Sequence, residues 1–211
     1  MWKLLLLSCV LALSSSSKAQ DENEKEWARH MKAGAKEYQE GLLKKYYQLN
    51  RAGAAVEFAK AERDLLAALT QTQQFPSGDE GTAVTLGMLA DTYMQEGKLT
   101  EAESRGNEAI AIMEKNLAPD NPRLGNDLIH MALIYDAESK SDQAAPLWDR
   151  ALTIFKKAPK APDPQLLSTL QIQAAPGEAP LGTKTSEHIY RFLLEIKEAK
   201  GASDEELVPV L

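Results

Sequence analysis

The sequence predicts an all-α protein in which antiparallel helix hairpins stack into a solenoid. Three observations lead to this prediction. A helical pattern of apolar and small residues recurs after 42 residues. A residue type that caps helices stands at the same phase in three places. Gly97 separates two helical patterns, and glycine commonly ends a helix.

Residues 1–19 are expected to form a secretory signal peptide. Lys3 precedes an apolar run at 4–13, and a serine-rich stretch and Ala19 follow it, which is the order found in such signals. The run is too short to cross a bilayer, which takes about 20 apolar residues. Two alternatives stay open, a buried core helix and lipid attachment at Cys9. We expect an exported protein, periplasmic or secreted, with a bacterial periplasm fitting best.

The composition narrows the classes of partner. The chain has 211 residues and a net charge of −7 at pH 7, without a basic run. An acidic chain of this kind repels nucleic acid phosphates and anionic lipid surfaces. Cys9 is the only cysteine, so the mature chain would have no disulfide and no thiol chemistry. We expect no membrane span in the mature chain.

The first helices are expected over residues 20–78. The charged segment 20–39 is predicted to be helical, either as an N-terminal cap or as an extension of the first repeat helix. Its apolar stripe consists of Trp27, Met31, Ala35 and Tyr38. The first repeat, 40–78, would have one helix around residues 42–49 and a turn within 50–57. Its second helix, 58–69, matches 99–110 at a shift of 41.

The two central repeats, 79–120 and 121–162, carry the pattern most clearly. In the first of them, one helix face is formed by Leu86, Leu89, Ala90 and Tyr93. A turn at 96–98 then leads to a second helix that begins near Leu99. In the first helix of the next repeat, 42 residues on, the corresponding residues are Leu128, Met131, Ala132 and Tyr135. In the second helix, Ala102, Gly106 and Ala109 correspond to Ala144, Trp148 and Ala151.

The repeat boundaries follow from the capping residues. Asn121 is expected to cap a helix that has Pro122 at its first position. Shifts of 42 residues lead to Asp79 and Asp163, which are also good caps. The last repeat, 163–200, is degenerate and would close the stack, with Tyr190 at the position of Trp148. Residues 201–211 are expected to be a flexible tail.

These positions resemble the tetratricopeptide repeat, a family of two-helix units. The spacing of 42 residues and the stretch 108–122 are more similar to the longer subtype of kinesin light chains. The resemblance covers roughly residues 42–196. It implies a right-handed superhelix in which the first helix of each hairpin lines a concave groove. Small residues would permit close helix packing, and Tyr93, Tyr135, Trp148 and Tyr190 would fill the core.

We expect no enzyme, no cofactor and no metal. The three histidines, His30, His130 and His188, fall in different units, and no pair has the spacing of a helical metal site. No nucleophile motif or phosphate loop is present in the mature chain. A hydrolase with an unrecognised site is the remaining enzymatic hypothesis.

The candidate site is the concave groove, which we expect to bind a protein or peptide. Asp91 and Asp136 would favour a partner with basic groups, and Ile129 and Leu133 would be exposed unless something covered them. The predicted groove residues are Val84, Met88, Asp91, Gln95, Asn126, Ile129, His130, Leu133 and Asp136. The alternative is a structural or self-associating component of a cell-envelope complex, a possible homo-oligomer. A further possibility is that the N-terminal segment closes the groove.

Overall fold

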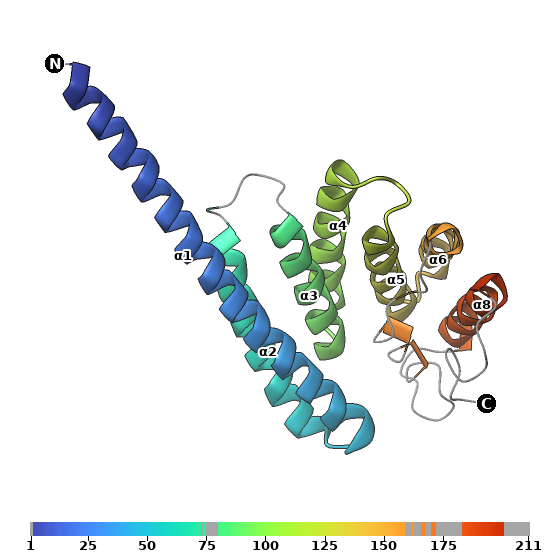
Figure 1. Cartoon of the computed structure of the whole chain (residues 1–211). Helices are drawn as coiled ribbons and strands as arrows, with labels where there is room; N and C mark the ends of the chain where they lie inside the picture. Colours follow the sequence, from blue (N-terminus) through green and yellow to red (C-terminus); the bar gives the residue numbers. More distant parts are fainter. Residues whose placement is uncertain are drawn as a thin grey trace.

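The computed structural model describes residues 2–72, 74, 80–158, 162, 166–167, 170–171 and 183–200, with side chains from Gln20 onward. These residues are helical apart from the connections, and no strand occurs among them. Figure 1 shows the helices following one another as a row of hairpins.

Among the described residues, three hairpins are followed by the helix α8. Helix α1 (Trp2–Leu42) continues through the π-helical turn η1 (Leu43–Tyr47), and α2 (Arg51–Thr72) packs against both. Helices α3 (Glu80–Glu96) and α4 (Leu99–Asn116) form the second hairpin, and α5 (Pro122–Ala137) and α6 (Ser141–Lys157) the third. Helix α8 (Thr183–Lys200) packs on α6. Contacts between α1 and α3, and between α3 and α5, place the first helices of the hairpins along one inner side.

The first hairpin differs in two respects from the sequence-based expectation. The segment 20–39 is an extension of the first repeat helix, because it lies within the single helix α1. The turn covers only residues 48–50, and the expected turn within 50–57 is wrong. The reason is local: Oδ1 of Asn50 accepts a hydrogen bond from the backbone N of Gly53 at 2.9 Å and so starts α2 at once.

The three hairpin turns share one backbone feature. Each contains a residue in the left-handed region: Leu49 with φ 53°, Gly97 with φ 78° and Ser139 with φ 62°. Glycine adopts this conformation without steric cost, whereas a side chain with a Cβ is strained there. Leu49 is therefore the residue least suited to its turn.

The helix cap at the third hairpin is confirmed. Oδ1 of Asn121 accepts a hydrogen bond from the backbone N of Arg123 at 2.9 Å, and Pro122 occupies the first helical position. The other two expected caps, Asp79 and Asp163, lie outside the described residues. Helix α3 begins at Glu80, directly after the first of them.

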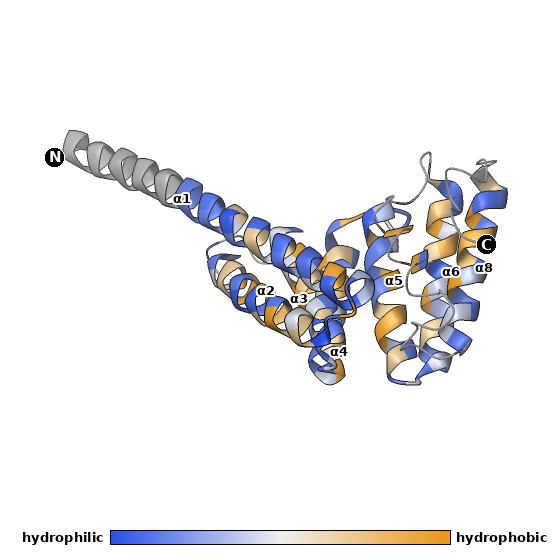
Figure 2. Ribbon diagram, turned by 90° about the horizontal axis from the view of Figure 1, so that it is seen from below, coloured by the Kyte–Doolittle hydropathy of each residue, from blue (hydrophilic) through white to orange (hydrophobic). Residues whose placement is uncertain are grey.

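Most of the expected core residues are buried. The repeated alanines Ala102, Ala109, Ala144 and Ala151 are at most 1% exposed, and Trp148 is 1% exposed. Figure 2 shows apolar residues, in orange, gathered on α5, α6 and α8, whereas the coloured part of α1, from Gln20 onward, is mainly hydrophilic. The core is therefore richest at the C-terminal end of the stack.

The expected register of the last repeat is wrong at its aromatic position. Tyr190 is 42% exposed and does not take the place of Trp148 in the core. Phe192 packs there instead, with its ring centroid 5.7 Å from that of Trp148. The last helix therefore meets α6 through a face displaced from the one that the shift of 42 residues indicates.

A lysine ties the second and the third hairpin turn to the preceding hairpin. Nζ of Lys98 lies 2.7 Å from a carboxylate oxygen of Glu62 on α2 and over the ring of Tyr93. Forty-two residues on, Nζ of Lys140 lies 2.7 Å from a carboxylate oxygen of Glu103 on α4. The repeat thus extends to the contacts between hairpins.

Candidate binding groove

One hollow on the inner side collects the predicted groove residues. It has a volume of about 290 Å³ and lies between α3 and α5, with Met113 of α4 at its edge. Five of the nine predicted residues line it: Val84, Met88, Asp91, Asn126 and His130. We call this hollow the groove pocket. Whether these residues bind a partner stays a prediction.

A histidine–carboxylate pair joins the two walls of the groove pocket. Nδ1 of His130 on α5 lies 2.6 Å from Oδ1 of Asp91 on α3. Burial acts to lower the pKa of His130, but the charge of Asp91 and the hydrogen bond to it outweigh burial and raise that pKa to about 8. The imidazole is therefore mainly protonated at neutral pH, and the pair is an ion pair.

Asp127, next to this pair, is the functional candidate that sequence reasoning missed. Burial raises the pKa of its carboxyl to about 6, and the nearby charge of Asp91 adds to this effect, while His130 and Arg123 oppose it. Oδ2 of Asp127 and Oδ1 of Asn126 are buried and accept no hydrogen bond from any described residue. The signal was present in the sequence, because a carboxylate stands here at the position of the neutral Thr85 one repeat earlier.

Two predicted groove residues belong to the core instead. Ile129 is fully buried and Leu133 is 1% exposed, so the expectation that they face the groove is wrong. Both belong to the core cluster that also contains Leu166, Leu170 and Ile189 from the last repeat. The degenerate repeat thus covers this part of α5.

Asp136 is also withdrawn from the groove. Its side chain is fully buried, and its Oδ2 accepts hydrogen bonds from Nε1 of Trp148 and from Nδ1 of His188, each at 3.1 Å. The carboxylate therefore links α5 to α6 and α8, and it is not available to a partner in the groove.

The N-terminal helix packs beside the groove pocket. Nε1 of Trp27 donates a hydrogen bond to Oγ1 of Thr85 at 2.9 Å and so fixes α1 against α3. Gln95, the ninth predicted residue, accepts hydrogen bonds through Oε1 from Lys45 at 2.8 Å and from the hydroxyl of Tyr46 at 3.3 Å. No residue of α1 is among those that line the groove pocket. Gln95 thus lies at the joint with α1 and η1, outside this pocket.

The described part of the chain contains neither a cluster of potential metal ligands nor a candidate membrane span. No group of three or more His, Cys, Asp or Glu side chains is arranged there to bind a metal ion. Within that same part, none of the helices combines the length and the apolar character that crossing a membrane requires.

A solenoid of stacked helix hairpins with an inner groove defines a class of repeat protein, and comparisons with known proteins identify the family. The family model described as tetratricopeptide repeat matches residues 55–115 and 81–157. The segment 55–157 thus matches the tetratricopeptide repeat family. Repeats of this family are typical of protein–protein interaction scaffolds without catalytic activity.

Solved structures with the same fold include kinesin-light-chain-like proteins. Nearly identical repeats of one from Podosopora anserina match with a TM-score of 0.52 and 18% identity over 78% of this chain and 79% of theirs. A point variant of those repeats matches with a TM-score of 0.53 and 20% identity over 78% of both chains. BtubC (BKLC) from P. vanneervenii matches with a TM-score of 0.50 and 14% identity over 89% of this chain and 77% of its own. At these identities the likeness shows the fold alone, and no curated protein matches the sequence.

Proposed function

We propose that this protein is an exported interaction module that binds a polypeptide partner in the groove between α3 and α5. The observation that carries the proposal is the groove pocket. Residues that the repeat pattern assigns to a binding face, 42 residues apart on two helices, meet around one hollow of about 290 Å³.

The chemistry of the groove pocket favours a partner with hydrogen-bond donors. Buried acceptors without a donor are costly, and Asn126 and Asp127 each contribute one such oxygen to the described structure. Val84 and Met88 supply an apolar wall, and methionine adapts to different partner shapes. A lysine or arginine of the partner would meet both needs, with its alkyl stem on the wall and its charge at the carboxylate.

Export rests on residues 1–19. Their order of a basic residue, a short apolar run and small residues supports removal of the segment on secretion. Mass spectrometry of the protein purified from its source cells tests this part: a chain that begins at Gln20 supports it, and a chain that retains Lys3 contradicts it.

The groove is tested with Val84→Arg, which places a large cation in the groove pocket. Leu66→Arg is the matched control, because Leu66 lies on α2 outside the described pockets and the two side chains are 38% and 37% exposed. We expect the mature chain and the control to capture the same partner from the envelope fraction, and Val84→Arg to lose at least about tenfold in affinity, which is 1.4 kcal/mol. Equal capture by all three would place the partner on another face.

Self-association is the second candidate, and one observation favours it. Tyr190 and Leu194 lie one turn apart on α8 and are 42% and 56% exposed, so the outer face of this helix carries two apolar side chains. We expect light scattering on the mature chain to give a monomer if the groove serves a different partner. A dimer that Leu194→Glu converts to monomer would favour the assembly role.

A further inference from the structure

We propose that a second surface, at the turn end of the first two hairpins, binds a peptide segment that carries acidic and aliphatic side chains. This surface surrounds a hollow of about 760 Å³ between η1, the start of α2 and the end of α3. We call it the tip pocket, and its walls include Lys45, Tyr46, Leu49, Arg51, Phe58 and Gln95. The proposal stands independently of the groove pocket.

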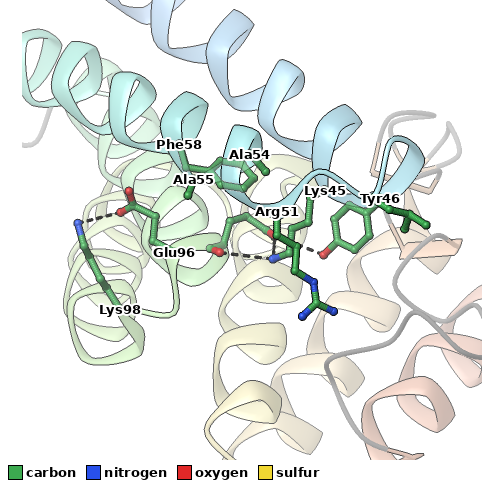
Figure 3. Close-up of a pocket in the computed structure, with 10 residues that line it drawn as sticks. Lys45, Tyr46, Arg51, Ala54, Ala55, Phe58, Glu96 and Lys98 are labelled. Atoms are coloured by element: carbon green, nitrogen blue, oxygen red, sulfur yellow. Dashed lines mark hydrogen bonds and ion pairs between the residues drawn. The ribbon is translucent and has the colours of Figure 1, made fainter.

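Two cations of the tip pocket have no carboxylate to balance them. Nζ of Lys45 donates to Oε1 and to the backbone oxygen of Gln95, at 2.8 and 3.4 Å, and both acceptors are neutral. Among the described residues, neither Lys45 nor Arg51 forms an ion pair with a carboxylate. Figure 3 shows Arg51 with its guanidinium turned away from the marked contacts. Burial lowers the pKa of Lys45, and the charge of Arg51 lowers it further, so the tip pocket disfavours the charge of Lys45.

The same pocket contains a balanced cation for comparison. Lys98 lies 2.7 Å from a carboxylate oxygen of Glu62 and 2.9 Å from one of Glu96. An incoming anion would therefore be drawn to Lys45 and Arg51, whose charges are not already neutralised. Because Lys45 also lies over the rings of Tyr46 and Phe58, at 5.4 and 5.9 Å, its amine is held in place at the pocket wall.

Exposed apolar side chains occur in the same stretch of chain as these cations, and one of them, Leu49, lines the tip pocket. Leu43, Tyr47 and Leu49 are 47%, 68% and 68% exposed, and they fall within one short stretch of η1 and the turn. Clustered exposed apolar side chains are typical of interaction surfaces. Leu49 also occupies the left-handed turn position that holds Gly97 and Ser139 in the later hairpins. A strained leucine exposed to water has no folding advantage, and a contact with a ligand would explain it.

The occupant follows from charge complementarity. A carboxylate can reach the two uncompensated cations, and an aliphatic side chain beside it can cover Leu49. A basic segment would be repelled by Lys45 and Arg51. A small inorganic anion would leave the apolar wall exposed to water, and the experiment below separates this case from a peptide.

Fluorescence anisotropy of the full chain with three labelled peptides tests the proposal. The sequence GDLLELG carries acids and leucines, GKLLKLG reverses the charges, and GDSSESG removes the leucines. We expect GDLLELG to bind at least about tenfold more tightly than the other two. If GDSSESG bound as tightly as GDLLELG, the tip pocket would be only an anion site. If GKLLKLG bound as tightly as GDLLELG, Lys45 and Arg51 would have no role in recognition. Either result overturns the proposal.

Variants locate the binding. Arg51→Glu and Lys45→Met should each weaken GDLLELG at least about tenfold, whereas Lys115→Glu, a charge reversal on the exposed face of α4, should not. Leu49→Asn should weaken binding without lowering the melting temperature, because asparagine tolerates the left-handed conformation. Val84→Arg should leave peptide binding unchanged, so failure here and failure in the groove pocket remain distinct. Unchanged binding by Arg51→Glu would contradict the proposal.

Discussion

Replacing Trp148 with alanine is expected to lower the free energy of unfolding by about 3–5 kcal/mol. The indole is 1% exposed and packs on the ring of Phe192 with a centroid separation of 5.7 Å. Its Nε1 also donates to the buried carboxylate of Asp136 at 3.1 Å. The substitution would therefore open a cavity between α6 and α8 and remove a donor from a carboxylate that has no access to water.

Urea denaturation followed by circular dichroism measures this effect. Trp148→Phe is the control, because it keeps an aromatic ring and loses only the donor and part of the volume. We expect it to cost about 1–3 kcal/mol, the range for losing one hydrogen bond to a buried carboxylate, which keeps its bond to His188. A loss below about 1 kcal/mol for the alanine variant would mean that α8 does not close the core.

The repeat pattern accounts for how much of the fold could be predicted. Positions related by 42 residues have the same structural role in α3 and α5. Leu86 and Leu128, for example, are both buried. Such positions face neighbours within the same unit or the next, so their surroundings recur with the sequence. The turn at Gly97 and the Asn121 cap are also local, and the sequence determines them without knowledge of distant contacts.

Positions in the last complete repeat do not have the same surroundings. Ile129 and Leu133 stand where Gly87 and Asp91 stand one repeat earlier, and the change from small or charged to branched apolar residues reflects the cover from the last repeat. The sequence contains this change, but it does not show what provides the cover. The same change is expected wherever a partner or a further helix lies on the groove.

Polar contacts between distant elements could not be predicted from the sequence, for a different reason. Asp136 meets His188, which is 52 residues away in the sequence and lies in the degenerate repeat, so no periodicity relates them. The groove pocket could be predicted in part. Periodicity placed Asp91 and His130 on facing helices, whereas their pairing and the desolvation of Asp127 depend on side-chain geometry.

Replacing Asp127 with asparagine is expected to stabilise the protein above neutral pH. Folding raises the pKa of this carboxyl from 3.8 to about 6, chiefly by burial. Its contribution to stability is therefore fully present below about pH 4 and is lost as the pH rises through about 6. The difference corresponds to on the order of 2–3 kcal/mol, since one pKa unit is about 1.4 kcal/mol. Asparagine cannot ionise, so the variant avoids this cost.

The pH at which the variant is compared decides the size of the gain. His130 is protonated below about pH 8 and then offsets part of the cost of Asp127, so the gain should be largest near pH 9 and small near pH 4. Urea denaturation at both pH values measures it, with Asp120→Asn, an exposed aspartate in the connection between α4 and α5, as the control. A gain independent of pH would show that the carboxylate is not desolvated.

The same variant links stability to binding. A protein that keeps a carboxylate at a net cost to folding has a use for its charge, and active surfaces commonly trade stability for function. A cationic group of a partner in the groove pocket would lower the pKa of Asp127 towards its ordinary value and recover the lost stability. We therefore expect Asp127→Asn to be more stable and to capture the partner less well at neutral pH. Higher stability with unchanged capture would mean that the carboxylate of Asp127 does not contribute to binding. The partner would then bind outside the groove pocket.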